Sequence, residues 1–522
     1  MYKFAFITIL LFLVSCHGHV DFDVASSSSS SNESNDSGTS YTPGLTQNLS
    51  GFHMGASWLT GSSGPFSDLT GEDRGFSIHS DPRGGAYLLG FSTSDLVEAN
   101  ANKDLILIRY NADASLDWVK HYGSVTLPNN TAGEAVFSAN QTDRAPEMVF
   151  DDSDNPIIVV STQSALYDTL DSLDVALINV NRTNGSIIWG KQYGQSISSA
   201  NSQDYVISAR KSGSKIYIAC VTNGAFAGNT HGGNDDVLII EADLNGNYLT
   251  SHQFNTRAVG GAATSNERVY AMEVVSDGLI FSGISANNVW SATGGTTFAA
   301  FLVKTNFSYT TQWSYTFGDN APTGLGINNS GKLYLLNSLE VDSSGNIYAG
   351  GYASAGTGGT GLKEDCSAEC SVVLSLTSSG ASRWLTHFGV TTSASSPFVA
   401  NTANDQITNI HVTDEGLYFV GYTQDDLFDT KNSTTNTSVT VGKLNKDTGA
   451  IIWGDQLGDS KYGSEFLAGS HTSHERPTDL YVFGDRLLVS GWTMNSTSET
   501  NQGSRDNFVF SWNKSTGAMD SP

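Results

Sequence analysis

Basic residues are scarce in this chain: 26 Lys and Arg stand against 52 Asp and Glu in 522 residues, a net charge of −26. Proteins that bind nucleic acid need Lys and Arg to replace the counterions of the phosphates. The composition therefore excludes nucleic acid as an expected partner. An acidic surface instead favours solubility and repels anionic membranes.

Long hydrophobic runs are also lacking. The apolar run Phe4–Val14 follows Lys3, and it is shorter than the roughly 20 residues of a transmembrane helix. It ends in Leu13-Val14-Ser15-Cys16, which resembles the lipobox of bacterial lipoproteins. The resemblance implies that residues 1–15 are a signal peptide and that Cys16 is lipidated, which would anchor the chain in a membrane. The alternative is an ordinary signal peptide with a chance Cys.

Aliphatic residues are nearly missing after Cys16. Residues 16–50 include Ser26–Ser31, and such a segment buries too little apolar surface to fold, so we predict a flexible tether. His17 is not Asp, so by analogy with enteric bacteria nothing signals inner-membrane retention. The expected location is the bacterial cell envelope, as an outer-membrane lipoprotein on the periplasmic side or the cell surface.

Only four cysteines are present. Cys220 lies in an apolar strand pattern and is expected to be a buried free thiol. Cys366 and Cys370 share a loop of an exported protein, where a disulfide is the default prediction. A metal-binding pair is the alternative.

Proline is scarce (10) and glycine abundant (54), which is typical of many short strands joined by Gly, Asn and Asp turns. One phrase recurs seven times: an alternating apolar strand, a tight turn, and a strand carrying Trp with Gly five residues later. Its clearest copies are Asp104–Gly123, Asp174–Gly194 and Ser438–Gly458. A second apolar phrase, after an Asp/Ser/Gly turn, alternates with the first. Together they predict units of four strands, a to d, with no competing helical period.

The unit Ile407–Leu457 illustrates the pattern. Its strands are predicted around Ile407–Val412 (a), Leu417–Tyr422 (b), Ser438–Leu444 (c) and Ile451–Leu457 (d). Four-stranded antiparallel units repeated radially form a β-propeller. We therefore predict an all-β, seven-bladed β-propeller over residues 51–522.

The two ends of the repeat array complement each other. The last copy, Asn507–Asp520, stops before its Trp strand, and a lone Trp strand, Ala56–Gly64, stands near the start. We predict that the N-terminal strand around Trp58 completes the last blade. The repeated Trp is expected to pack between neighbouring blades, so unit three, whose strand Leu249–Phe254 lacks it, should have a looser seam.

The repeat resembles a known family. Asp342–Tyr352 (DSSGNIYAGGY) is close to the consensus of the bacterial seven-bladed β-propeller (SBBP) repeat, which implies an extracytoplasmic propeller without shared catalytic residues. The turns Asn184-Gly185 and Thr448-Gly449 before Ile-Ile-Trp also resemble those of pyrroloquinoline-quinone-type propellers. The dehydrogenases of that group need a vicinal Cys pair, which this chain lacks.

Connection lengths differ between the two faces of the predicted ring. The a–b and c–d turns are short, whereas the b–c and d–a connections, such as Asp459–Pro477, are long and leave from one face. Long loops on a rigid scaffold are where binding usually occurs. The candidate binding-face aromatics are Phe137, Tyr167, Trp290, Phe398, Phe428 and Tyr462. The alternative is that these rings tuck under their own loops.

Signals for chemistry are weak. His471–Glu475 lacks the spacing of a helical zinc site. Asp151–Asn155 and Asp342–Asn346 resemble fragments of calcium loops, although Asp, Ser, Asn and Gly also make tight turns. No catalytic or phosphate-binding motif is found. We therefore predict no metal and no cofactor, with calcium as the alternative.

Three functions remain open. The first is a monomeric binding module that recognises an envelope protein or a glycan through its long loops. The second is an enzyme, a lyase or hydrolase, which would need carboxylates, His or Tyr converging at the central channel on the long-loop face. The third is an envelope-assembly or structural lipoprotein.

Overall fold

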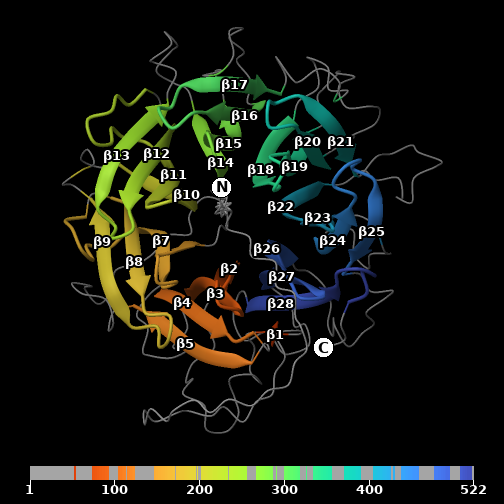
Figure 1. Cartoon of the computed structure of the whole chain (residues 1–522), viewed down its shortest axis with the longest axis horizontal. Coiled ribbons are helices and arrows are strands. Elements are labelled where there is room, and N and C mark those ends of the chain that lie inside the picture. Colours follow the sequence, from red (N-terminus) through yellow and green to blue (C-terminus); the bar gives the residue numbers. More distant parts are fainter. Residues whose placement is uncertain are drawn as a thin grey trace, which may run out of the picture.

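The computed structural model shows an all-β ring of seven four-stranded antiparallel sheets (Figure 1). The fold is a seven-bladed β-propeller, as predicted. The structure describes residues 52–53, 73–92, 104–112, 115–123, 146–170, 172–194, 197, 202–232, 234–254, 266–285, 290, 299–317, 325, 333–354, 369–388, 404–424, 427–428, 437–457, 475–493 and 506–519. Among these residues, no helix has the length and apolar character needed to cross a membrane.

Each blade contributes one strand to each of four concentric positions. The innermost a strands are β2 (Asp73–Ser80), β6 (Glu147–Phe150), β10 (Asp204–Ser212), β14 (Glu267–Val275), β18 (Leu333–Val341), β22 (Asp405–Thr413) and β26 (Glu475–Phe483). The b strands are β3 (Ala86–Ser92), β7 (Pro156–Thr162), β11 (Lys215–Thr222), β15 (Gly278–Ser285), β19 (Ile347–Ser354), β23 (Gly416–Thr423) and β27 (Arg486–Thr493).

The outer half of each blade is built in the same way. The c strands are β4 (Asp104–Tyr110), β8 (Asp174–Val180), β12 (Asp236–Asp243), β16 (Ala299–Thr305), β20 (Glu369–Leu376), β24 (Ser438–Leu444) and β28 (Asp506–Asn513). The d strands are β5 (Leu116–Tyr122), β9 (Ile187–Tyr193), β13 (Tyr248–Phe254), β17 (Thr311–Thr316), β21 (Ser382–His387), β25 (Ile451–Gln456) and, in the last blade, β1 (Phe52–His53).

An N-terminal strand closes the ring, but it is not the predicted one. β1 pairs with β28, with Phe52 opposite Val509 and His53 opposite Phe508. This register gives His53 the place that Gln456 has opposite Thr440 in β25. The repeat therefore aligns by this position rather than by its Trp. Trp58 and the rest of Ala56–Gly64 lie outside the described residues.

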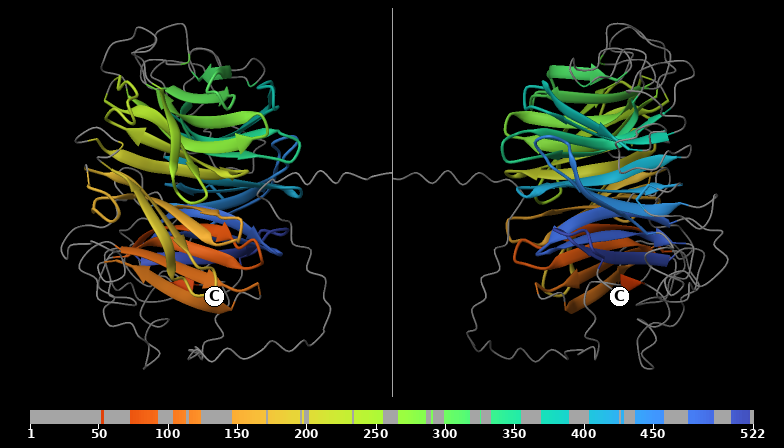
Figure 2. Two further views of the ribbon diagram at one scale, coloured as in Figure 1. Left: turned by 60° about the vertical axis from the view of Figure 1, so that its left-hand side comes forward. Right: turned by 90° about the vertical axis from the view of Figure 1, so that its right-hand side faces the viewer.

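The core lies between neighbouring sheets. The b and c strands are buried along almost their whole length because both of their faces meet an adjacent blade; β4, β7, β8, β23 and β24 have no exposed residue. Figure 2 shows the ring from two further sides, with the sheets packed face to face around it. Burial on both faces explains why apolar or small residues fill most positions of these strands, on both sides of the sheet.

The Trp residues of the d strands join neighbouring blades, as predicted. Trp384 Nε1 donates to the carbonyl of Lys446 in the c–d turn of the next blade (2.9 Å). The ring lies over Gly449, where an added Cβ would sit 2.5 Å from Trp384. Gly449 has φ +72°, a conformation that glycine adopts without strain. Trp118, Trp189 and Trp453 lie over Gly185, Gly246 and Gly517 in the same way.

The seam after unit three, which was predicted to be looser, is packed differently from the others. Thr250 takes the Trp position there and is exposed. The next blade's turn carries Tyr309, with φ +60°, at the position that Gly246 occupies one blade earlier. Tyr309 stacks on His252 and its hydroxyl donates to Glu241 (2.7 Å). An aromatic ring from the turn thus replaces the missing ring of the strand.

Candidate binding face

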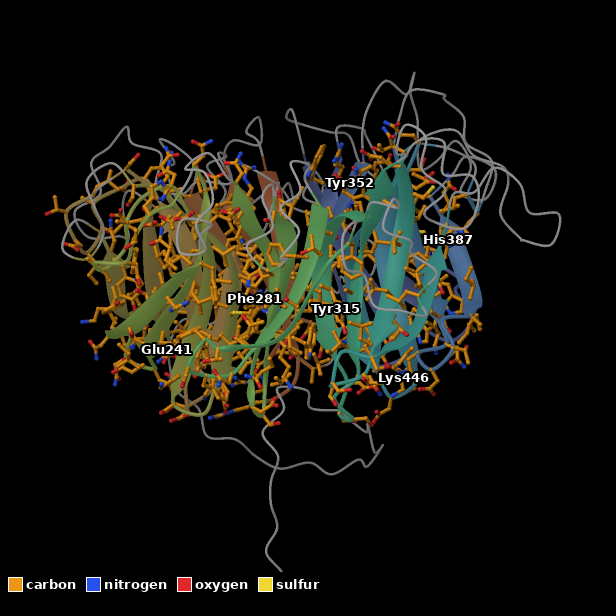
Figure 3. All side chains as sticks on the ribbon, turned by 90° about the horizontal axis from the view of Figure 1, so that it is seen from above. Glu241, Phe281, Tyr315, Tyr352, His387 and Lys446 are labelled. Carbon is orange, nitrogen blue, oxygen red and sulfur yellow. The ribbon has the colours of Figure 1, made fainter. Side chains whose placement is uncertain are left out.

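The two faces of the ring are built from different connections. Strands a and c begin at one face, here called the upper face, so the d–a and b–c connections leave from it, and the a–b and c–d turns form the lower face. In Figure 3, Tyr352 and His387 lie toward the upper face, and Glu241 and Lys446 toward the lower one. The predicted asymmetry is confirmed: β10 and β11 are separated by residues 213–214, whereas β25 and β26 are separated by residues 457–474.

Turns of the lower face satisfy their own polar groups. Asp342 accepts hydrogen bonds from the backbone of Ser344 and Asn346 and from the Asn346 amide. Burial acts to raise the pKa of Asp342, but these bonds and one from the Tyr348 hydroxyl outweigh it and hold the pKa below its usual value. Asp151 binds Ser153 and Asn155 in the same pattern. Turn geometry therefore accounts for the Asp-rich fragments that resemble calcium loops.

One pair of positions recurs at the upper end of each blade. The first member lies near the start of strand c and pairs with a residue at the end of strand b. The second member lies on strand d and faces the residue two places after the first member. We call this pair the clamp. The c-strand members are Asp104, Asp174, Asp236, Ala299, Cys370, Ser438 and Asp506, and the d-strand members are His121, Gln192, Gln253, Thr316, His387, Gln456 and His53.

The clamp of the second blade shows the chemistry. Gln192 Nε2 donates to the buried Asp174 carboxylate (2.7 Å). Gln192 Oε1 accepts the backbone N–H groups of Leu166 (2.8 Å) and Tyr167 (3.0 Å) in the b–c connection. One amide thus ties the connection to strands c and d, and leaving these buried groups unpaired would cost about 1–3 kcal/mol each.

The third blade repeats this arrangement, and the sixth blade repeats its bonds to the b–c connection. Gln253 Nε2 donates to Asp236 (2.7 Å) and its Oε1 accepts the N–H of Phe226. Burial raises the pKa of Asp236, against the opposing hydrogen bonds from Gly232 and Gln253. Gln456 Oε1 accepts the N–H groups of residues 427 and 428 at 2.9 and 3.0 Å.

Three of the six candidate aromatics fall within the described residues. Tyr167 and Phe428 are half-buried and lie over Gly190 and Gly454, where an added Cβ would be 1.9 and 2.1 Å from the rings. Trp290 packs against Phe301 with ring centroids 4.3 Å apart. Packing accounts for these three rings, which favours the alternative of tucked aromatics. Phe137, Phe398 and Tyr462 lie outside the described residues.

Of the other predicted site residues, some lie within the described ranges and some lie outside them. Cys220 is a buried free thiol, as expected. Cys370 is buried and disulfide-bonded, whereas Cys366, Cys16 and His471–His474 lie outside the described residues. The pairing of Cys366 with Cys370 stays a prediction. Within the part of the chain that the structure describes, no three His, Cys, Asp or Glu side chains are grouped as metal ligands would be.

Charged side chains gather at the ring axis, where the enzyme hypothesis expected them, but toward the wrong face. Arg210, Glu340 and His411 lie near the ends of β10, β18 and β22, and these ends lead into lower-face turns. Arg210 binds Glu147 (3.0 Å) and Glu273 (2.7 Å) on the two flanking blades. Aligning the a strands by their bulges would have revealed these polar positions, but the sequence prediction did not do so.

A series of hydrogen bonds between the inner strands joins all seven blades in a ring. In order, the bonds run from Ser77 to Pro146 O, Ala209 N to Glu147, Arg210 to Glu273, Ser282 to Leu336 O, Ser338 to Asn409, Asn409 to Asp479 and Ile78 N to Asp479. Burial raises the pKa of Asp479 to about 7. Burial and the nearby Arg210 lower the pKa of His79 to about 3. A neutral histidine can act as a base, but the hydrogen bonds described for this region join neighbouring blades.

Comparisons with known proteins identify no family for this chain. No known protein family matches the chain, and no curated protein matches it. Among solved structures it is similar to the polysaccharide lyase Uly1 (8% identity, TM-score 0.44, 90% of this chain and 94% of that one). It is also similar to the plexin A4 extracellular region (8% identity, TM-score 0.43, 89% of this chain and 51% of that one). A third structure is the quinohemoprotein alcohol dehydrogenase of Comamonas testosteroni (9% identity, TM-score 0.38, 88% of this chain and 78% of that one). At these TM-scores the similarities carry no argument about activity or ligand.

Proposed function

We propose that this chain is a binding module that recognises an envelope protein or glycan with its upper face. The observation that carries the proposal is the clamp: buried Gln192, Gln253 and Gln456 each fix the base of a b–c connection on the face where the long connections gather. Preorganised loops lose less entropy on binding. The lower face, with short turns that satisfy their own polar groups, offers no comparable surface among the described residues.

We further propose that the ring is an SBBP-type propeller held in the envelope by lipidated Cys16 and the tether of residues 16–50. Cys16→Ala should release the protein from the membrane fraction, because the anchoring acyl chains would be lost. Fractionation of cells that express the two forms tests this, and an unchanged membrane fraction for the variant contradicts it.

Trimming one long connection tests the binding proposal. The d–a connection before β26 should be shortened within residues 459–474 and not as far as Pro477, because β26 begins at Glu475. We expect weaker retention of the full chain on immobilised envelope extract or envelope polysaccharide, with little change in melting temperature, because loop length affects stability weakly.

A lower-face variant is the control. Asp414→Ala with Lys446→Ala removes an exposed ion pair of 3.5 Å, which contributes little to stability. This variant should bind like the wild type. Equal loss of retention in both variants, or retention unchanged by trimming this and the other long connections, would contradict recognition through the upper face.

A further inference from the structure

The second residue of an a strand lies at the upper face, because the a strands begin there. In β14 this residue is Arg268, which forms an ion pair with Asp235 of the preceding blade (2.7 Å). In β22 it is Gln406, whose amide donates to Glu369 of the preceding blade. Both acids stand directly before the c-strand member of the clamp. These two seams therefore pair a polar side chain of strand a with a carboxylate of the neighbouring blade.

The seam between the sixth and seventh blades lacks that carboxylate. The second residue of β26 is Arg476, but the residue directly before the clamp member Ser438 is Thr437, which carries no charge. Thr437 Oγ1 donates instead to the carbonyl of Glu475 (3.0 Å). Among the side chains that the structure describes, Arg476 meets no carboxylate in an ion pair. Six other described arginines do: Arg83, Arg109, Arg182, Arg210, Arg268 and Arg383.

Arg476 lies over Tyr422 instead. Its guanidinium carbon is 4.4 Å from the centre of the Tyr422 ring, and Nη1 donates to the Tyr422 hydroxyl (3.2 Å). Tyr422 has in β23 the register of Tyr352 in β19, which lies toward the upper face in Figure 3. Tyr422 is buried and Arg476 half-buried. A guanidinium that stacks on a ring keeps the N–H groups of its edge for a bidentate bond, and a carboxylate is the acceptor that fits this edge.

We propose that Arg476 and Tyr422 form a subsite for a single carboxylate, carried by an acidic sugar of an envelope glycan. The inference rests on the proposed binding function of the upper face and names the chemistry of its ligand. A single carboxylate is favoured over a polyanion because the chain has a net charge of −26. That charge repels every carboxylate of a polyanion, whereas salt screens a lone carboxylate from charges more than about 8 Å away.

The exposed side chains favour a glycan over a protein as the carrier of this carboxylate. The core of a protein interface is apolar. The large apolar side chains that are exposed among the described residues are Ile188, Leu249, Phe307 and Ile452. All four lie in c–d turns or at the starts of d strands, and so toward the lower face. At the upper face, the second residue of β10 is the half-buried Tyr205, and a ring with a hydroxyl suits the faces and hydroxyl groups of a sugar.

Two matched sugars test the subsite on the full wild-type chain. Methyl β-glucuronide carries the carboxylate, and methyl β-glucoside has a hydroxymethyl group in its place. Ligand-observed NMR titrations at physiological ionic strength should show the glucuronide binding on the order of tenfold more tightly, as one charge-assisted contact would give. Equal affinities, or no binding of the glucuronide, would overturn the subsite.

Substitutions at residue 437 provide a matched pair of variants. Thr437→Asp supplies the acid that the seams of Arg268 and Gln406 have, so it should occupy Arg476 and weaken glucuronide binding on the order of tenfold. Thr437→Asn has nearly the same shape without the charge and should bind like the wild type. Equal binding by these two variants would overturn the role of Arg476. Arg476→Gln should abolish the preference for the glucuronide, whereas Arg268→Gln, which removes an arginine already paired with Asp235, should keep it.

A third ligand and a retention assay complete the test. N-acetyl-diglycine carries a carboxylate as the end of a protein does, and binding as tight as that of the glucuronide would overturn the assignment to a glycan. Arg476→Gln should also weaken retention of the chain on envelope polysaccharide, and unchanged retention would overturn that assignment too. If the glucuronide does not bind while trimming of the long connections still reduces retention, this inference fails and the binding proposal stands. The comparison of the two sugars needs no substituted chain to fold.

Discussion

His252 and Tyr309 lie with their rings stacked, 4.8 Å apart and within 4° of parallel, across the seam between the third and fourth blades. At five other seams a Trp on strand d covers a turn glycine, as Trp189 covers Gly246. Here the strand has Thr250 and the turn has Tyr309. The aromatic ring has moved from one side of the seam to the other, and the contact between blades is kept.

This exchange predicts a favourable coupling between positions 250 and 309. Tyr309→Gly relieves a positive φ but loses the stacked pair, worth about 0.5–1.5 kcal/mol, and the bond to Glu241, so we expect a net loss of about 2 kcal/mol. Thr250→Trp alone has a tyrosine beneath it and should also destabilise. Together the two substitutions restore a Trp–Gly seam. The double variant should therefore lose less unfolding free energy than the sum of the losses in the two single variants, as measured by chemical denaturation. Strict additivity would contradict the exchange.

The turn glycines under the Trp rings should be more sensitive than other left-handed glycines. Gly449→Ala adds backbone strain of about 1 kcal/mol and places a methyl group against Trp384, whereas Gly213→Ala, with φ +57° and no atom within 4 Å, adds strain only. We expect Gly449→Ala to lower the unfolding free energy by about 1–3 kcal/mol more than Gly213→Ala. Thermal or urea unfolding of the two variants measures this difference, and similar losses would show that the Trp contact is loose.

Changing the clamp glutamine to glutamate should have different effects in two blades. In Gln192→Glu, the new carboxylate keeps its acceptor but loses the donor to Asp174 and meets a second buried carboxylate. In Gln456→Glu, the c-strand member is Ser438, which carries no charge. Gln192→Glu should therefore cost several kcal/mol at pH 7 and recover in part at acidic pH, while Gln456→Glu should be milder and less dependent on pH. Unfolding curves of both variants at pH 5 and 7 measure these losses. Equal losses with equal pH dependence would show that the Asp174 carboxylate does not affect residue 192.

The repeat explains which parts of the structure were predictable. Strand alternation and the Trp phrase gave four strands per unit, and β24 runs over the predicted Ser438–Leu444. The closing strand was misplaced because Trp58 was used to align it, whereas the shared feature is the clamp position held by Gln456 and His53. The clamp and the axial bonds join positions far apart in sequence, such as Ile78 and Asp479. A pattern read along the chain carries no information on such contacts unless the seven copies are first aligned.

Asp479 should make the stability of the ring depend on pH. Its folded pKa of about 7 lies above its ordinary value of 3.8, with burial as the main cause. The folded state therefore holds this proton more tightly than the unfolded state. The stabilisation is fully present below about pH 4 and is lost as the pH rises through 7. His79 acts in the opposite direction over an overlapping range, because its folded pKa is lowered to about 3, so the wild-type curve alone does not isolate Asp479.

The difference between wild type and Asp479→Asn does isolate it. Asparagine cannot titrate, and the hydrogen bonds it loses to Ile78 or Asn409 cost a similar amount at every pH. The wild type should therefore exceed the variant in unfolding free energy by most at pH 4. The gap should shrink by up to about 4 kcal/mol toward pH 8, at about 1.4 kcal/mol per pKa unit. Urea unfolding at intervals across this range measures the gap, with His79→Gln as the control that leaves Asp479 in place. A gap that stays constant, or widens as the pH rises, would show that Asp479 is ionised in the ring at all these pH values and serves only as a hydrogen-bond acceptor.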